Sequence, residues 1–221
     1  MNKNDQQLAD FRQNYDLYSL SETAVQSSPF EQFRQWLNAT IEANFYEPNA
    51  MILATANSQA IPSIRTVLLK DFGVEQGFVF FTNYQSRKGR EIAQNPHGSL
   101  LFYWDKLHRQ VRIEGTLQKI APEVSDSYFS SRPLGSQIGA IASPQSEVIE
   151  SRELLETRMA HLSEQYEQQK QQPQRPEHWG GYSLHPHYFE FWQGRTNRLH
   201  DRIAYQYEAT TGIWHIERLA P

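Results

Sequence analysis

The chain has 221 residues, of which 38% are hydrophobic and 13% aromatic, and its formal net charge is −4 at pH 7. This composition is too apolar for a disordered chain, and the charge provides no global basic field for nucleic acid or a membrane surface. The lack of cysteine excludes disulfides, thiolate catalysis, zinc–thiolate sites and cysteine-ligated iron–sulfur clusters. There is no apolar run near the roughly 20 residues of a membrane span, and the polar N-terminus does not resemble a signal peptide, so we expect a cytoplasmic enzyme.

Residues 1–27 are polar and weakly periodic, and we expect them to form an N-terminal arm. Residues 28–221 are expected to form a single domain. A helix is predicted from Ser28, which would form a capping box with Glu31. Helical spacing predicts that this helix has one buried face, made of Phe30, Phe33, Trp36, Leu37 and Ile41.

From Met51 the apolar pattern indicates short strands joined by tight turns, over residues 51–56, 64–70, 78–82, 99–104 and 110–120, with a short helix over 86–94. Two further helices are predicted, over 122–131 and 146–169. The longer one has an apolar face of Val148, Leu155, Met159, Leu162 and Tyr166. Strands over 188–192, 203–207 and 214–219 would then close the same sheet. This order predicts an α+β, mainly β fold in which the sheet curls into a barrel with peripheral helices.

Cations lie at both ends of the predicted strand that runs from Arg65 to Lys70. Side chains alternate along a strand, so these two cations would point to opposite faces and could serve two different anions. Two surface cations at the strand ends are the alternative interpretation.

Ser86-Arg87-Lys88 lies at the start of a predicted helix. Unpaired backbone N–H groups at that helix end, the hydroxyl and two cations could together hold a phosphate. An ordinary N-cap with a solvated basic turn explains the same residues.

A later group combines a cation with two polar side chains. Tyr128, Arg132 and Ser136 follow one another at a spacing of four, although Pro133 predicts that the helix ends near Arg132 and that Ser136 reaches back from a turn. They could grip a phosphate, or simply provide a favourable cation at a helix C-terminus.

Arg198, His200 and Arg202 would share one face if this stretch is extended. Three neighbouring potential cations repel one another, which favours an anionic or electron-rich ligand, and histidine can exchange a proton near neutral pH. A solvated edge strand is the alternative. His178, His185 and His187 are interpreted as satisfied or solvated histidines rather than metal ligands, and the chain contains neither a Gly-rich dinucleotide fingerprint nor a P-loop.

In their order and spacing these segments resemble the pyridoxamine 5′-phosphate oxidase family. The resemblance extends from about residue 28 to the end and rests on these segments: Arg65-Thr66-Val67-Leu68-Leu69-Lys70, Phe81-Thr82-Asn83, Ser86-Arg87-Lys88, Arg109-Gln110-Val111, Ser130-Ser131-Arg132-Pro133, Ser136-Gln137-Ile138-Gly139-Ala140, Pro144-Gln145-Ser146, Trp179-Gly180-Gly181, Phe191-Trp192-Gln193-Gly194, Arg198-Leu199-His200-Asp201-Arg202 and Glu217-Arg218-Leu219-Ala220-Pro221.

The resemblance implies an FMN-binding split barrel and a homodimer with FMN at the subunit interface. The implied FMN contacts are Arg65, Thr66, Val67, Leu68, Leu69, Lys70, Phe81, Thr82, Arg87, Lys88, Gln110, Gln145, Ser146, Trp192 and Arg202. The implied substrate contacts are Lys70, Tyr128, Arg132, Ser136, Arg198, Leu199 and His200, with Arg198 and His200 as the catalytic pair. In the family an arm motif can close over the site, and Arg12 and Tyr15 match its two ends.

The activity that the resemblance implies is the oxidation of pyridoxamine and pyridoxine 5′-phosphates to pyridoxal 5′-phosphate. A hydride would pass from C4′ to N5 of FMN, and O₂ would be reduced to H₂O₂. A split-barrel flavin reductase would need the FMN residues but not Tyr128, Arg132, Ser136 and the Arg198/His200 pair. A non-catalytic carrier of pyridoxal phosphate would produce no peroxide, and the negative net charge argues against a barrel that binds single-stranded nucleic acid.

Overall fold

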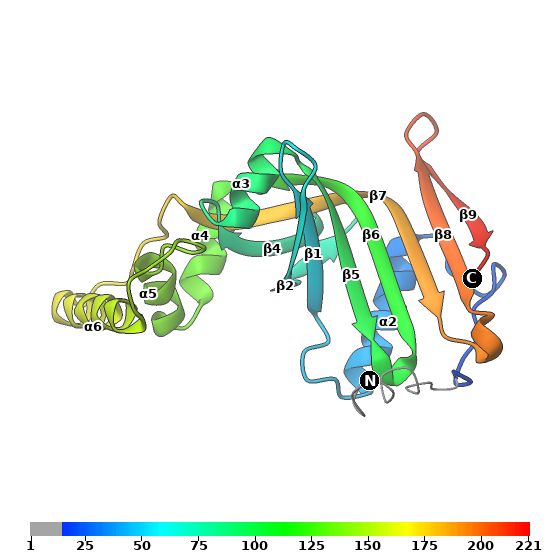
Figure 1. Cartoon of the computed structure of the whole chain (residues 1–221), viewed down its shortest axis with the longest axis horizontal. Coiled ribbons are helices and arrows are strands. Elements are labelled where there is room, and N and C mark those ends of the chain that lie inside the picture. The colour runs from blue at the N-terminus through cyan, green and yellow to red at the C-terminus, as the bar shows by residue number, and fades with distance from the viewer. Residues whose placement is uncertain (1–14) are drawn as a thin grey trace, which may run out of the picture. The chain divides into compact units, whose positions relative to one another are not determined.

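A computed structural model describes residues 15–221, so the predicted contact Arg12 lies outside the described residues (Figure 1). The strands are β1 (Ala50–Ala56), β2 (Pro62–Leu68), β3 (Asp71–Gly73), β4 (Gly77–Asn83), β5 (His97–Trp104), β6 (Arg109–Lys119), β7 (Trp179–Gln193), β8 (Asp201–Glu208) and β9 (Ile213–Leu219). The helices are α2 (Pro29–Glu42), α3 (Arg87–Gln94), α4 (Pro122–Ser131), α5 (Leu134–Ala142) and α6 (Arg152–Gln169), and two 3₁₀ turns cover Asp105–Leu107 and Thr196–Arg198. The strands form a sheet in the order β2-β1-β5-β6-β7-β4-β3, with β8 and β9 added beside β7. The predicted mainly β fold class is confirmed.

The chain divides into two compact units. The first unit contains the chain up to Pro48 together with Leu101–Ile113 and His187–Pro221, and the second contains Asn49–Leu100 and Glu114–Pro186. Strands β5, β6 and β7 contribute residues to both units. The division into an arm and one domain stays a prediction.

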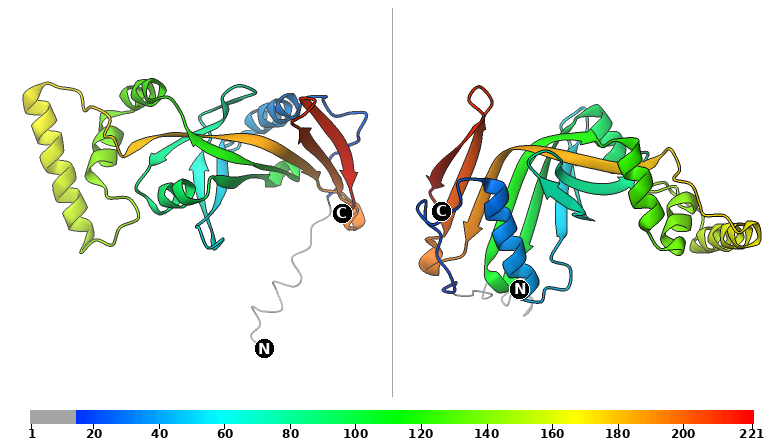
Figure 2. Two further views of the ribbon diagram at one scale, coloured as in Figure 1. Left: turned by 90° about the horizontal axis from the view of Figure 1, so that it is seen from above. Right: turned by 180° about the vertical axis from the view of Figure 1, so that it is seen from behind.

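In the first unit, α2 packs its aromatic face against strands. Figure 2 shows the ribbon of α2 alongside strands of the sheet. Phe30 meets Phe189 with ring centroids 5.4 Å apart, Trp36 meets Phe191 at 5.2 Å, and Phe33 is completely buried. Burying each such side chain contributes about 1.5–3 kcal/mol.

The details of α2 correct the sequence prediction in two places. Ser28 is the N-cap residue but makes no side-chain cap, so the predicted capping box is wrong. Ile41, expected on the buried face, is 53% exposed because the helix ends one residue later and its last turn leaves the aromatic contacts.

The second unit is built on antiparallel pairs. β1 pairs with β2 from Ala50↔Leu68 to Ala56↔Pro62, and β4 pairs with both β3 and β7. Met51, Leu53, Phe78, Phe80 and Leu100 form its core, each no more than 1% exposed. Helix α3 approaches the chain before it so closely that a Cβ on Gly89 would lie 2.1 Å from the backbone oxygen of Tyr84.

The strand expected over 64–70 ends at Leu68, which leaves Lys70 outside it. The argument that Arg65 and Lys70 point to opposite faces of one strand is therefore wrong.

Three other boundaries also differ from the prediction. The turn expected at Ser136 is helix α5. Helix α6 begins only at Arg152, and Val148 lies outside it, fully exposed. Strand β7 begins at Trp179 rather than near residue 188, and it therefore includes Pro186. Among the residues that the structure describes, none of the helices has the length and apolar character that a membrane crossing requires.

Candidate active site

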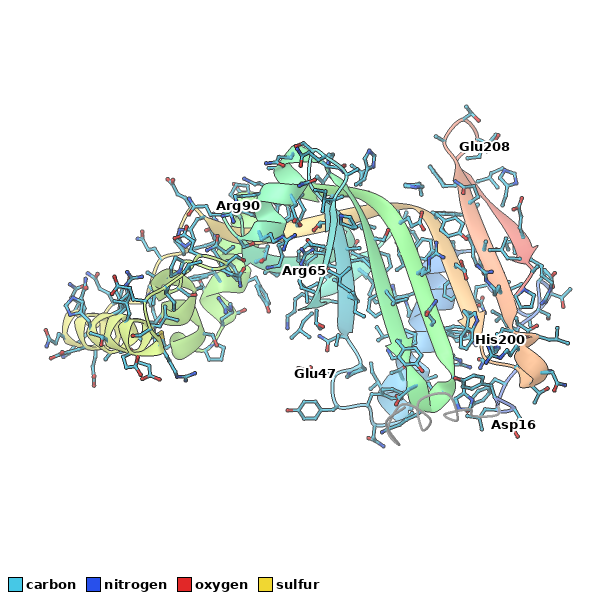
Figure 3. All side chains as sticks on the ribbon, viewed as in Figure 1. Asp16, Glu47, Arg65, Arg90, His200 and Glu208 are labelled. Carbon is cyan, nitrogen blue, oxygen red and sulfur yellow. The ribbon has the colours of Figure 1, made fainter. Side chains whose placement is uncertain are left out.

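The first predicted phosphate site is organised by a carboxylate, Glu91 on α3. Arg65 on β2 lies 3.1 Å from Glu91 Oε2, and Arg87 lies 2.9 Å from Oε1 (Figure 3 labels Arg65). Thr55 and Ser63 also donate hydrogen bonds to Oε2, at 2.5 and 2.6 Å. Burial opposes ionisation of Glu91, but these hydrogen bonds outweigh it and lower its pKa to about 2. Glu91 therefore stays charged and holds two guanidinium groups in place.

Lys88 completes this cluster from the first turn of α3. Ser86, which is completely buried, caps the helix by accepting the Gly89 N–H at 3.3 Å. Lys88 is only 9% exposed, and its Nζ donates to Thr82 Oγ1 at 3.2 Å and to Gln145 Oε1 at 3.1 Å. Burial, followed by the charge of Arg65, lowers its pKa to about 8. The alternative of a solvated basic turn therefore applies to the exposed Arg87 but not to Lys88.

The second predicted phosphate site lies around Arg132, the C-cap residue of α4. Its guanidinium lies over the ring of Trp179, 4.7 Å from the centroid. Its Nη1 is buried and has no hydrogen-bond partner among residues 15–221. A buried charged donor without a partner is costly, so a ligand that accepts its hydrogen bond would stabilise this arrangement.

Tyr128 on α4 stacks on Phe81 of β4, with centroids 3.9 Å apart and an angle of 17° between the rings. The stack continues to Trp179, whose ring lies 5.5 Å from Phe81. These contacts fix the wall of the cavity beside Arg132.

One cavity of about 530 Å³ in the second unit brings the two predicted sets together. Its walls include residues predicted to contact FMN and residues predicted to hold the substrate phosphate: Thr66, Val67, Leu68, Lys70, Phe81, Thr82, Lys88, Tyr128, Arg132, Ser136 and Gln145. Four predicted FMN residues of this unit do not line it: Arg65, Leu69, Arg87 and Ser146. Leu69 is a buried core residue, and Ser146 is an exposed residue with φ of 74°.

In the first unit, His200 follows the 3₁₀ turn that precedes β8 (Figure 3). Its Nδ1 accepts the Arg195 N–H at 3.1 Å, so the neutral ring carries its proton on Nε2. The ring lies 4.7 Å from Trp192 and 5.8 Å from Tyr15. Burial, and then the charge of Arg198, lowers the pKa of His200, while Asp201 opposes this change.

The residues beside His200 are not extended. Asn197 and Arg198 both have positive φ, 55° and 61°, and Arg198 and Leu199 are exposed. The condition under which Arg198, His200 and Arg202 would share one face, an extended stretch, is therefore not met, since β8 begins only at Asp201. Left-handed backbone at a non-glycine residue such as Arg198 is uncommon and clusters at functional sites.

Arg202 on β8 is held by Glu190, which is 3% exposed on β7. Its Nε donates to Glu190 Oε1 at 2.8 Å, and its Nη1 donates to the backbone oxygen of Ala220. Glu190 also pairs with Arg112 at 3.2 Å. Gln110, another predicted FMN contact, is half-buried on β6.

Sequence reasoning missed the two carboxylates that organise the arginines. The i,i+4 spacing from Arg87 to Glu91 is a signal that could have found one of them. Glu190 lies in an aromatic strand with no such signal. Among residues 15–221, no three histidine, aspartate or glutamate side chains are grouped closely enough to hold a metal ion.

Two family models match the chain. The model described as pyridoxamine 5′-phosphate oxidase matches residues 37–166, and the one described as the pyridoxine 5′-phosphate oxidase C-terminal dimerisation region matches residues 179–221. Among curated relatives, the pyridoxine/pyridoxamine 5′-phosphate oxidase of Paraburkholderia phymatum is 58% identical over 97% of this chain and 99% of its own length. The protein of the same name from Gloeothece citriformis is 54% identical over 98% of this chain and all of its own length.

Two solved structures are similar in fold. PhzG from Burkholderia lata 383, in complex with tetrahydrophenazine-1-carboxylic acid, has a TM-score of 0.86 and 29% identity, covering 95% of this chain and 100% of its own. An FMN-binding protein related to pyridoxamine 5′-phosphate oxidase, from Nostoc punctiforme PCC 73102, has a TM-score of 0.68 and 16% identity, covering 88% and 98%. The split-barrel fold expected from the sequence is confirmed by this likeness.

Proposed function

The chain belongs to the pyridoxamine 5′-phosphate oxidase family, and on that premise we propose that it is an FMN-dependent oxidase of pyridoxamine and pyridoxine 5′-phosphates. Its product would be pyridoxal 5′-phosphate, with O₂ reduced to H₂O₂. The observation that carries this proposal is the shared cavity, which Lys70, Lys88 and Arg132 all line, together with the buried Nη1 of Arg132, which has no hydrogen-bond partner among the described residues. Two phosphate-bearing aromatic ligands need two such cationic groups in one place.

The residues around Glu91 fit the phosphate of FMN. Arg65, Arg87 and Lys88 provide three positive charges and Glu91 one negative charge, which leaves a net +2. A phosphate monoester carries about −1.5 to −2 at pH 7, so the charges match. The Ser86-capped start of α3 adds the helix N-terminus, which favours an anion. We propose that Thr66–Leu69, Phe81, Thr82, Gln145 and Ser146 complete this part of the cofactor site.

The substrate phosphate would bind to Arg132, Lys70, Tyr128 and Ser136. Arg132 presents a donor that lacks a partner, and its stacking on Trp179 fixes the guanidinium plane. Lys70 and Ser136 line the same cavity and are exposed, so they are accessible to a ligand. These contacts would orient the pyridine ring by its phosphate.

FMN, when bound, supplies the two-electron chemistry that no side chain of this protein can perform. The chain itself would position the substrate and manage one proton. His200 donates from Nε2 because its Nδ1 is occupied by the Arg195 N–H. The exposed Arg198 adjacent to it would orient the substrate ring, and Leu199 and Tyr15 would contact it. We propose that Trp192, Arg202 and Gln110 contribute to FMN binding.

A homodimer is part of this proposal. The matched dimerisation region, residues 179–221, includes His200, Arg202 and Trp192. We propose that FMN binds at the subunit interface and that the protein works in the cytoplasm.

The likeness to PhzG suggests a rival substrate class. The molecule bound to that protein, a tetrahydrophenazine carboxylic acid, contains no phosphate. Arg132, Lys70 and Ser136 form a second cationic site beyond the one assigned to FMN, and they favour a phosphorylated substrate. The identity to PhzG, 29%, is also lower than the 58% to the Paraburkholderia phymatum oxidase.

The test is a visible spectrum of the purified protein followed by anaerobic addition of pyridoxamine 5′-phosphate. Bleaching of a flavin band supports the proposal. A protein that takes up no FMN, or whose flavin is reduced by tetrahydrophenazine-1-carboxylic acid but not by pyridoxamine 5′-phosphate, refutes it.

Two variants test the assignment of roles. Arg198→Ala should lower the rate of flavin reduction far more than it lowers FMN retention. Arg87→Ala should weaken FMN binding first, because Arg87 belongs to the Glu91 cluster. Equal losses of both properties in Arg198→Ala would show that its role is misassigned.

A further inference from the structure

Arg218 of β9 binds the N-terminal segment from Tyr15 to Glu22 to the C-terminal strands through hydrogen bonds and an ion pair. Arg218 Nε and Nη2 lie 2.8 Å from the two carboxylate oxygens of Glu22, and Nη1 lies 2.9 Å from Asp201 Oδ1. Nη2 also donates to the backbone oxygen of Leu20 at 3.0 Å. We call Glu22, Arg218 and Asp201 the clasp. One guanidinium thereby fixes two carboxylates and a carbonyl.

This geometry is more specific than that of an ordinary surface ion pair. Arg218 and Glu22 meet as a bidentate fork, which is the strongest arrangement of these two groups. The hydrogen bond from Arg218, together with a backbone hydrogen bond, lowers the pKa of Glu22 to about 2, so the pair is charged near neutral pH.

The clasp also reaches the loop that carries His200. Asp201 follows His200 directly, and its Oδ2 accepts the Leu20 N–H at 3.0 Å and lies 3.6 Å from Arg195 Nε. Arg195 in turn donates to the backbone oxygen of Tyr18 at 2.9 Å and, through its N–H, to His200 Nδ1. The N-terminal segment therefore contacts the loop on both sides of Arg198.

Tyr15 fits into the same loop. Its ring lies edge-on to His108 at 4.6 Å, to Trp192 at 5.8 Å and to His200 at 5.8 Å. A Cβ at Gly194 would lie 2.8 Å from Tyr15, so the absence of a side chain there makes room for the ring. When the segment is held, Tyr15 and Trp192 confine the His200 ring.

We propose that Glu22 and Arg218 are positioning residues, which hold segment 15–22 against loop 194–201 and thereby fix the orientation of His200. They touch neither cofactor nor substrate in this scheme and act only through Asp201, Arg195 and Tyr15. Only the kinetic part of the inference rests on the proposed function.

The test compares Glu22→Gln with Glu217→Gln. Both changes remove one negative charge, but Glu217 is exposed on β9 and forms no ion pair within the part of the chain that the structure describes. Glu22→Gln should slow anaerobic flavin reduction by pyridoxamine 5′-phosphate about threefold, and Arg218→Met about tenfold, because these changes remove one and then both ion pairs. Glu217→Gln should leave the rate unchanged, FMN content should stay constant in all three, and Arg218→Lys should recover part of the loss.

A second readout does not need activity. In an NMR spectrum of protein labelled with ¹⁵N-histidine, the signals of His200 are the ones that disappear in His200→Asn. The Nδ1 signal of His200 should show one hydrogen-bonded tautomer. Glu22→Gln should broaden or shift that signal, and Glu217→Gln should not.

Two results overturn the inference. One is a His200 signal that is unchanged in both Glu22→Gln and Arg218→Met. The other is a loss of rate that disappears when the variant is assayed well below its own melting temperature, because such a loss reflects stability alone. If the wild-type flavin is not reduced by the vitamer, the proposed function fails, and the ¹⁵N readout alone decides the inference. If Arg218→Met does not fold, Glu22→Gln decides it.

Discussion

Replacing Arg132 with methionine should weaken the use of phosphorylated substrates without affecting unphosphorylated ones. Methionine is shorter than arginine and lacks the guanidinium that lies over Trp179, but its flexible apolar side chain can still pack beside that ring, so most of the cavity wall should remain. What is lost is the guanidinium, including its buried Nη1 donor, which has no partner in the part of the protein that the structure describes.

The size of the expected loss in kcat/KM follows from the kind of hydrogen bond that is removed. A hydrogen bond to a charged group contributes about 1.5–3 kcal/mol. Because Arg132 is half-buried, solvent screens the interaction only in part, and a loss of about 2–3 kcal/mol is expected, which equals a roughly 30- to 150-fold fall in kcat/KM.

The assay is steady-state peroxide production with pyridoxamine 5′-phosphate and, separately, with pyridoxamine. The fall should appear with the phosphorylated substrate, mainly as a higher KM, and not with pyridoxamine. Arg158→Met, on the exposed surface of α6, is the matched control and should leave kcat/KM unchanged for both substrates. An equal fall with both substrates would refute the assignment of Arg132 to the substrate phosphate.

Three further predictions concern the groups around the site. The pKa of Lys88 is lowered to about 8, so FMN affinity should be constant near pH 7 and should fall as the pH rises through 8 and Lys88 loses its proton. Titration of the apoprotein with FMN at a series of pH values measures this affinity, and an affinity that stays constant up to pH 9.5 contradicts the prediction. Gly89→Ala would place a Cβ 2.1 Å from the backbone oxygen of Tyr84 and should lower the free energy of unfolding by about 1–3 kcal/mol. Gly135→Ala, whose new Cβ would have no described atom within 4 Å, should raise that free energy slightly, and equal denaturation midpoints for the two variants would refute the packing argument. Glu190→Gln should destabilise the fold by about 2–3 kcal/mol, below the usual cost of breaking a buried pair because both partner arginines are partly exposed; urea denaturation measures it, and a loss under 0.5 kcal/mol would count against that reasoning.

The parts of the fold that the sequence predicts well are those where one local signal dominates. Apolar alternation locates β1, β4 and β8 to within about two residues, and Ser86 caps α3 as expected. In each of these cases burial and local propensity favour the same structure.

The failures come from tertiary context. Pro186 lies within β7 because that strand pairs with β4 up to Leu184 and with β8 only from Tyr188, so the missing N–H falls between the two ladders. Helix α5 was missed because Pro133 was interpreted only as a helix end, although it is also the N-cap residue of the next helix.

The candidate site shows the same division. Patterns of residue type locate the cations, since Arg65, Lys88 and Arg132 are visible as charged residues in apolar or helix-end positions. They do not show that Glu91 also pairs with Arg65, because that contact joins two elements through residues 26 positions apart in the sequence. Nor do they show that Arg198 adopts a left-handed backbone.

Glu91 has a consequence for the order in which this protein is assembled. Three cations brought together without a counter-ion would oppose folding until a phosphate arrived. Glu91 neutralises part of that charge from within the chain, so we expect the protein to fold without a bound phosphate. FMN, if it is the cofactor as proposed, would then bind as a later step to a site that is already formed.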